Sequence, residues 1–276
     1  MRSPRFPITD DHIHIDPANG RGIGAAGDFQ RAGGTHLFLV SKPSGSLGIH
    51  PKTGDDYTRV FDETLRIAGL IGDTGLVVFP VLGVHPSEIS RLLERMPLAD
   101  AVSVMKAGLD VAARYVQEGR AVALKSGRPH YPVAAEVWDA SNKILFHALT
   151  LAADVGCAVQ IHAESGPCAD VVVMAENAGM AKERVVKHYG SPETPLHPSL
   201  IAKHEAIPAL AQERRPFTME SDFMDENSRP GAVTGPKSVP RNTKKLLESG
   251  QITEEDCFRI HAETVERVYR VTITLG

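Results

Sequence analysis

The segment DHIHID, residues 11–16, places two histidines two positions apart on an expected β-strand. Side chains two apart on a strand point to the same face, with Cα atoms about 6.6 Å apart, so both imidazoles can hold one metal ion. His162, His188 and Asp222 each lie at the end of a later apolar run, in QIHAE, VVKHY and MESD. Because parallel strands of a barrel end on one face, these side chains predict a metal site there.

Each of these residues alone has a simpler explanation. A single histidine at a strand end is usually a hydrogen-bonded structural residue, and Asp222 could cap a turn. The pair of His12 and His14 is more specific, because burying two adjacent imidazoles requires partners for several ring nitrogens. Taken together, the residues favour a metal site over a set of unrelated structural contacts.

The stretch VALKSGRPH, residues 122–130, raises a different question, because Lys125 ends an apolar strand just before a glycine turn. A lone buried ammonium costs free energy unless a partner pairs with it or its charge is removed. The residue therefore needs either an acidic neighbour or a chemical role.

The chain that positions these groups has 276 residues, close to the roughly 250 of one α/β barrel. Short β-rich runs alternate with segments whose apolar residues recur every three or four positions. We therefore expect an α/β fold in which residues 1–276 form a single (β/α)8 TIM barrel. The eight strands are expected at residues 8–15, 35–41, 76–83, 121–125, 157–163, 184–189, 199–204 and 216–221.

Composition narrows the class of protein. The chain has 42% apolar and 23% charged residues, and its N-terminus lacks the apolar segment of a secretory signal. With no apolar run of about 18 residues and only scattered cysteines, we expect a cytoplasmic protein that does not contact membranes. The formal charge of −4 does not indicate broad nucleic-acid binding, although a local basic patch would still allow it. The sequence leaves the oligomeric state open.

The segment GRGIGAAG, residues 20–27, has glycines in the spacing of a dinucleotide-binding turn. That turn normally follows an apolar strand directly and precedes an acidic residue about 20 positions later. Here Asp16 and Pro17 intervene, and position 42 is a lysine. We interpret the segment as a flexible loop beside the site.

Nearly the whole chain resembles the amidohydrolase superfamily of metal-dependent hydrolases, and within it the TatD-like family, particularly its archaeal TatD-related branch. The motifs that carry the resemblance are DHIHID, GVHPSE (83–88), GRPHYP (127–132), QIHAES (160–165), VVKHY (185–189) and MESDFMDENSRPGAVTGPKSVPRNTKKLL (219–247). The resemblance implies that His12 and His14 hold one metal ion and that His162 and His188 hold a second. It also implies that Asp222 contacts the nucleophilic water.

The resemblance further implies a carboxylate after the fourth strand that bridges the two ions. TatD-like proteins use a glutamate there, whereas this sequence has Lys125. The phosphotriesterase-like branch of the superfamily uses a lysine whose Nζ has reacted with carbon dioxide, and the resulting carbamate bridges two cations as a glutamate does. Burial beside cations disfavours the ammonium and so promotes this reaction. The alternative is that Lys125 stays an ammonium, which snorkels to the rim or pairs with Asp222 or Glu220.

This reading predicts hydrolysis by a water molecule that two divalent ions activate, with Asp222 as the catalytic base. Zinc suits a histidine-rich site, and manganese, nickel or cobalt could occupy the same ligands. Substrate-binding residues are expected among those near the strand ends, namely His85, Arg128, His130 and Arg229.

Three functions remain open at this point. The first is cleavage of a phosphoester, either a small phosphodiester or a nucleic-acid end. The second is hydrolysis of a lactone or an amide, as the lysine variant does elsewhere in the superfamily. The third is a non-catalytic, metal-binding relative that has lost its bridging carboxylate.

Overall fold

The computed structural model describes residues 6–228 and 234–275 of the chain. Its centre is one curled sheet of parallel strands in the order β8-β7-β6-β5-β4-β3-β2-β1-β9. The strands are β1 Thr9–His14, β2 His36–Val40, β3 Val77–Gly83, β4 Ala123–Gly127, β5 Ala158–His162, β6 Val185–Lys187, β7 His197–Ile201, β8 Thr218–Glu220 and β9 Phe223–Met224.

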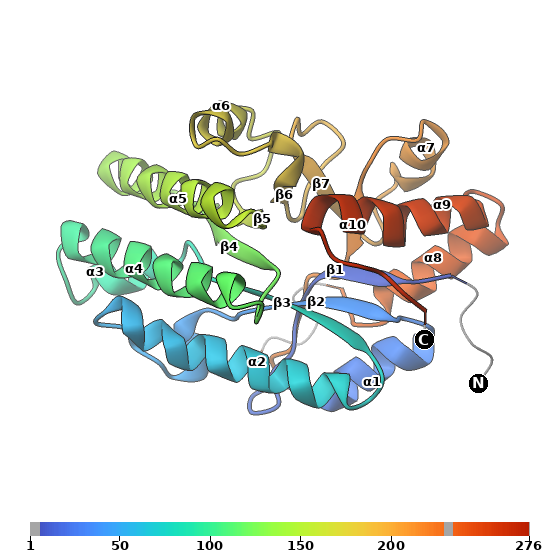
Figure 1. Cartoon of the computed structure of the whole chain (residues 1–276), viewed down its shortest axis with the longest axis horizontal. Helices are drawn as coiled ribbons and strands as arrows, with labels where there is room; N and C mark the ends of the chain where they lie inside the picture. The colour runs from blue at the N-terminus through green and yellow to red at the C-terminus, as the bar shows by residue number, and fades with distance from the viewer. Residues whose placement is uncertain (1–5, 229–233, 276) are drawn as a thin grey trace.

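Helices follow the strands along the chain and lie outside the sheet (Figure 1). They are α1 Ile23–Ala32, α2 Thr58–Gly72, α3 Glu88–Leu93, α4 Leu98–Gln117, α5 Ala135–Val155, α6 Asp170–Asn177, α7 Ile207–Gln212, α8 Ser238–Glu248, α9 Glu254–Phe258 and α10 Thr264–Tyr269. The three longest, α2, α4 and α5, bury one apolar face each, as the three- and four-residue spacing predicts. None of the helices in the described ranges is long and apolar enough to cross a membrane.

The expected α/β fold with a barrel-like parallel sheet is confirmed, but the strand count differs from eight. All eight predicted runs overlap a strand, and β8, the strand in the last run, is followed after two residues by β9. Asp222 breaks the run because its φ of 45° is incompatible with an extended strand. Its N–H donates to the carbonyl of His12 at 3.0 Å, and Phe223 then pairs with Ile13. The chain after β8 therefore meets β1, which brings the two ends of the sheet together.

The seventh strand is displaced from its predicted position. It was expected at residues 199–204 and is found at His197–Ile201. The strand ends early because the N–H of His204 donates to the carbonyl of Ile201 at 2.7 Å, which closes a turn. His204 consequently lies in the connection to α7 rather than at the strand end.

Side chains inside the curled sheet form layers, because alternate residues of a strand point the same way. One interior layer is apolar and includes Ala123 and Ala158, and α10 packs against it through Tyr269. Two residues further along the same strands, the interior positions are Lys125 and Gln160. The strands thus change from apolar to polar interior residues as they approach their carboxyl ends, where the candidate site lies.

The glycine-rich segment after β1 forms no nucleotide-binding turn. The carboxylate of Asp225 accepts the N–H groups of Asp16 at 3.0 Å, Arg21 at 2.7 Å and Gly22 at 2.8 Å. Gly22 adopts a φ of 53°, and a Cβ there would lie 2.8 Å from Cα of Pro17. The amides that would face a phosphate in a dinucleotide site are therefore bound to a protein carboxylate.

Candidate metal centre

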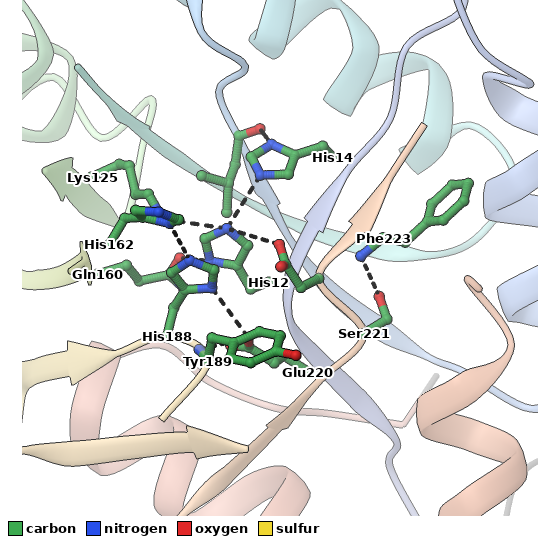
Figure 2. A network of polar contacts seen from close by, with 12 residues as sticks. His12, His14, Lys125, Gln160, His162, His188, Tyr189, Glu220, Ser221 and Phe223 are labelled. Carbon is green, nitrogen blue, oxygen red and sulfur yellow. Dashed lines mark hydrogen bonds and ion pairs between the residues drawn. The ribbon is translucent and has the colours of Figure 1, made fainter. Parts of the chain in front are cut away.

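The predicted ligands come together at the carboxyl ends of the strands (Figure 2). His12 and His14 lie on β1, Lys125 on β4 and His162 at the end of β5. His188 follows β6 directly, and Asp222 lies between β8 and β9. His12, His188 and Asp222 each offer one ligand atom, and these atoms lie within 4.8 Å of one another.

The two histidines of β1 are each held through Nδ1. Nδ1 of His12 lies 2.7 Å from Oε1 of Gln160, and Nδ1 of His14 lies 2.8 Å from the carbonyl oxygen of Val40. An amide or carbonyl oxygen only accepts, so in both rings Nδ1 carries the proton and, in the neutral ring, Nε2 carries a lone pair. The two Nε2 atoms lie 3.2 Å apart. Two lone pairs this close repel each other unless a cation or a proton lies between them.

Gln160 is itself fixed, which determines the orientation of its amide. Its Nε2 donates to the carbonyl of Asp11 at 2.7 Å and contacts the hydroxyl of Tyr269 at 2.8 Å. The oxygen Oε1 must therefore face His12. These contacts of Gln160 hold the imidazole of His12 in an orientation suited to a metal ligand, as is usual around protein metal ions.

His188 has a carboxylate behind it. Its Nδ1 lies 3.1 Å from Oε1 of Glu220, which also accepts the N–H of Tyr189 at 2.8 Å. Its ring stacks on the ring of His12 with a centroid distance of 4.1 Å, and its Nε2 lies 2.7 Å from Nδ1 of His162. Glu220 thus directs Nε2 of His188 towards the other imidazoles.

Burial controls the charges of the site. Desolvation lowers the pKa of His14 to about 3 and that of His12 and His188 well below the usual range, so the imidazoles are neutral and able to bind a metal. Desolvation also lowers the pKa of Lys125 to about 7, although Asp222 and Glu220 oppose the shift. Burial therefore favours the unprotonated amine of Lys125.

Asp222 is the carboxylate of the set. Its Oδ1 lies 4.0 Å from Nε2 of His12, and desolvation raises its pKa to about 6 while Lys125 opposes this. The amine of Lys125 lies 3.4 Å from Nε2 of His12. Nitrogen and oxygen donors of this kind suit a divalent ion such as zinc. The residues present therefore fit the metal that the sequence predicts.

Two of the four expected substrate-binding residues lie at the edge of this cluster. The ring of His85 lies 4.7 Å from that of His162, and its Nδ1 is bound to the hydroxyl of Ser87 at 2.7 Å. His130 is exposed, and its Nδ1 lies 2.7 Å from Nε2 of His162. Arg229 lies outside the described residues.

Arg128, expected to bind substrate, is instead buried and paired with other side chains of the protein. Only 1% of the residue is exposed, and its guanidinium donates to Glu164 at 2.8 Å and to Asp170 at 2.9 Å. It also lies over the ring of Trp138 at 4.7 Å. The donors of Arg128 are thus engaged within the protein, where they join the segment after β5 to α5 and α6.

Gln160 and Glu220 were not predicted as site residues. A signal exists, because each lies two positions before a predicted ligand, His162 and Asp222, and so shares its face of the strand. Their partners, however, are His12 and His188 on other strands. Only the packing of the strands reveals which imidazole each one supports.

Comparison with known proteins supports the family. The chain matches the family model of TatD related DNases over residues 9–270. It is 36% identical over 283 residues to a Methanocaldococcus jannaschii protein named "Uncharacterized protein MJ1127", covering 98% of each.

Solved structures show the same fold. The TatD homologue YJJV from Escherichia coli is 15% identical, with 97% of this chain and 99% of that one covered and a TM-score of 0.61. A mutant of a PTE-like lactonase from Deinococcus radiodurans is 15% identical, with 96% of each chain covered and a TM-score of 0.62. Because the family model spans nearly the whole chain, the protein belongs to the TatD-related DNase family and is a hydrolase.

Proposed function

We propose that this protein is a metal-dependent hydrolase that cleaves a phosphoester with two divalent ions. Zinc is the proposed ion, because imidazole nitrogens predominate among the ligands. The observation that carries the proposal is the orientation of the histidines. Each of His12, His14 and His188 has an acceptor at Nδ1. His12 and His188 share a cluster of candidate ligand atoms with Asp222, and Nε2 of His14 faces that of His12 at 3.2 Å. Structural histidines need no such convergence.

The proposed ligands follow from this arrangement. His12 and His14 would hold one ion and His162 and His188 the other, with Asp222 beside the first. Bound divalent ions would lower the pKa of water towards neutrality and polarise the phosphoryl oxygen. Manganese, nickel and cobalt fit the same donors.

The bridge between the ions is proposed to be a carbamate on Lys125. Neutral Nζ would attack the carbon of carbon dioxide and form an N–C bond. The electron pair of one C–O π bond would move onto its oxygen, and the nitrogen would lose one proton to solvent. The lowered pKa of Lys125, about 7, supplies the neutral amine. The carbamate would carry one negative charge and two oxygen ligands. It would offset part of the positive charge of two divalent ions, which neutral imidazoles leave unbalanced.

Asp222 is proposed as the catalytic base. Its carboxylate would accept the proton of the attacking water and pass it to the leaving oxygen, because it lies beside the cluster and remains partly exposed, at 16% of its side chain. His85 and His130 flank His162 and are proposed to contact the substrate. The family name points to DNA as one source of phosphoesters, while the charge of −4 gives no general support for nucleic acid.

A lactone is the second candidate substrate. The D. radiodurans protein is named a PTE-like lactonase. The resemblance described for the sequence associates a lysine at the bridging position with the phosphotriesterase-like branch. A panel of aryl phosphodiesters, phosphotriesters, lactones and N-acyl amino acids separates these substrates. Turnover of lactones without any phosphoester would refute the first proposal.

The first experiment is metal analysis of protein prepared with zinc and bicarbonate. We expect about two ions per chain in the wild type and fewer in Lys125→Ala. Lys187→Met is the control, since Lys187 is another buried lysine, whose amine donates to the carbonyl oxygens of Ala163 and His188, both at 3.4 Å. Carbon-13 NMR after labelling with bicarbonate should show a carbamate signal that Lys125→Ala lacks.

Lys125→Glu tests the non-catalytic alternative. A glutamate restores the carboxylate that TatD-like relatives use, so recovery of two ions and of activity only in this variant would indicate that wild-type Lys125 is an ammonium. Equal metal content in the wild type and Lys125→Ala would refute the bridging role.

A further inference from the structure

A cavity of about 800 Å³ lies apart from the metal centre, beside α1 and α8. These two helices are neighbours in the fold (Figure 1). Its lining comes from the segment after β1, the segment after β7 and residues 235–245. Arg21 and Lys203 follow β1 and β7, so this part of the lining lies towards the carboxyl ends of the strands, where the metal centre is. Asp28 and Lys245 lie further along α1 and α8.

The lining is strongly cationic. It contains Arg21, Lys203, Lys237, Arg241 and Lys245, with Asp28 as the one acidic residue among those that line it. This concentration of positive charge stands against the overall charge of −4. Like charges in one concave surface raise the local potential and attract anions.

Asp28 neutralises only part of this charge. Its carboxylate pairs with Arg21 at 2.7 Å, Arg31 at 2.6 Å and Lys237 at 3.1 Å. The hydrogen bond from Arg21 holds the pKa of Asp28 well below its usual range, so the group carries a single negative charge throughout. One carboxylate therefore faces three cations.

The other three cations have no ion-pair or hydrogen-bond partner for their side chains within residues 6–228 and 234–275. These are Lys203, Arg241 and Lys245. Lys244, next in sequence to Lys245, shows the contrast, because its amine donates to the carbonyl of Ala32 at 2.6 Å. Three unpaired cations from two separate segments thus share one cavity.

We propose that this cavity binds a phosphate group carried by a larger ligand. Phosphate offers several oxygen acceptors and up to two negative charges, which matches a guanidinium and two ammonium groups better than a single carboxylate does. The cavity has the size of small-molecule sites, about 300–1,000 Å³, and so has room for more than one inorganic anion.

The site also has a consequence for the substrate, and this step rests on the proposed function. A substrate cleaved at the metal centre could extend along the rim and place a second phosphate in the cavity. The substrate class would then be molecules with at least two phosphate groups.

Calorimetric titration of metal-free protein with pyrophosphate tests the cavity independently of hydrolysis. We expect Arg241→Gln/Lys245→Gln to weaken binding at least tenfold. Lys52→Gln/Lys143→Gln removes the same charge from exposed positions outside the cavity and should bind as the wild type does. Lys203→Gln, on a separate segment, should also weaken binding, which guards against a local effect on α8.

The outcomes are distinct. Equal affinity in the wild type and the cavity variants, or no binding by the wild type, would overturn the proposal. For a phosphoester found by substrate screening, the double variant should raise KM without lowering kcat when the substrate carries a second phosphate. An unchanged KM would overturn only the inference that the substrate places its second phosphate in the cavity. The absence of any turnover would count against the hydrolase proposal, but the pyrophosphate titration would still test the cavity.

Discussion

Substitutions of Glu220 should show whether this residue supports metal binding in addition to stabilising the fold. Glu220 is fully buried, and its Oε1 accepts from Tyr189 at 2.8 Å and lies 3.1 Å from Nδ1 of His188. Its Oε2 has no hydrogen-bond partner among the described residues. Glu220→Gln therefore retains the useful oxygen and replaces an unpartnered atom, whereas Glu220→Leu removes the acceptor.

The magnitude follows from the two donors. A buried donor without a partner costs about 1–3 kcal/mol, so Glu220→Leu, which leaves two such donors, should lower the free energy of unfolding by about 3 kcal/mol. Glu220→Gln keeps both donors paired but buries its own NH2 without a partner, so it should cost about 1–3 kcal/mol. Loss of an outer-shell partner lowers metal affinity by about 10–100-fold, and we expect this for Glu220→Leu. Glu220→Gln should lose less, because Nδ1 of His188 keeps its acceptor.

Urea unfolding of metal-free protein and competition for zinc with a chromophoric chelator measure the two effects. Glu88→Leu is the matched control, since Glu88 is also buried and accepts from the N–H of Ser44 at 2.7 Å and its hydroxyl at 2.8 Å. It should cost stability and leave zinc affinity unchanged. Wild-type zinc affinity in folded Glu220→Leu would refute the role assigned to Glu220.

Two further substitutions test the packing beneath the site. Gly83→Ala should destabilise the fold by about 3 kcal/mol, because its Cβ would lie 1.8 Å from the carbonyl oxygen of Lys125. Gly24→Ala is the control, because a Cβ there meets no heavy atom within 4 Å. Equal urea midpoints for the two variants would contradict the tight approach of β3 and β4. His261 is buried, and desolvation lowers its pKa to about 4, against about 6.5 in the unfolded chain. Its contribution to the free energy of unfolding is therefore fully present above pH 6.5 and is lost as the pH falls towards 4. Between pH 7 and pH 5 the wild type should lose about 2 kcal/mol more than His261→Gln in urea unfolding, and identical losses would show that His261 is not the group responsible.

Much of the strand framework could be predicted because its signal is local. Each predicted run overlaps a strand, since apolar β-rich segments between amphipathic helices satisfy both faces of a covered parallel sheet. The spacing of His12 and His14 fixes their common face, because the strand period is two. The ninth strand could not be predicted, since it depends on the φ of Asp222 and on pairing with β1.

Contacts between distant segments decided the rest. The sequence by itself determined which types of ligand occur at the strand ends, through alternation and composition. Only the tertiary structure decided that Gln160 orients His12, that Arg128 pairs with Glu164, and that Lys203 shares a cavity with residues of α8. The physical reason is that side-chain partners and electrostatic fields depend on distance in space, which one-dimensional spacing specifies only within a single strand or helix.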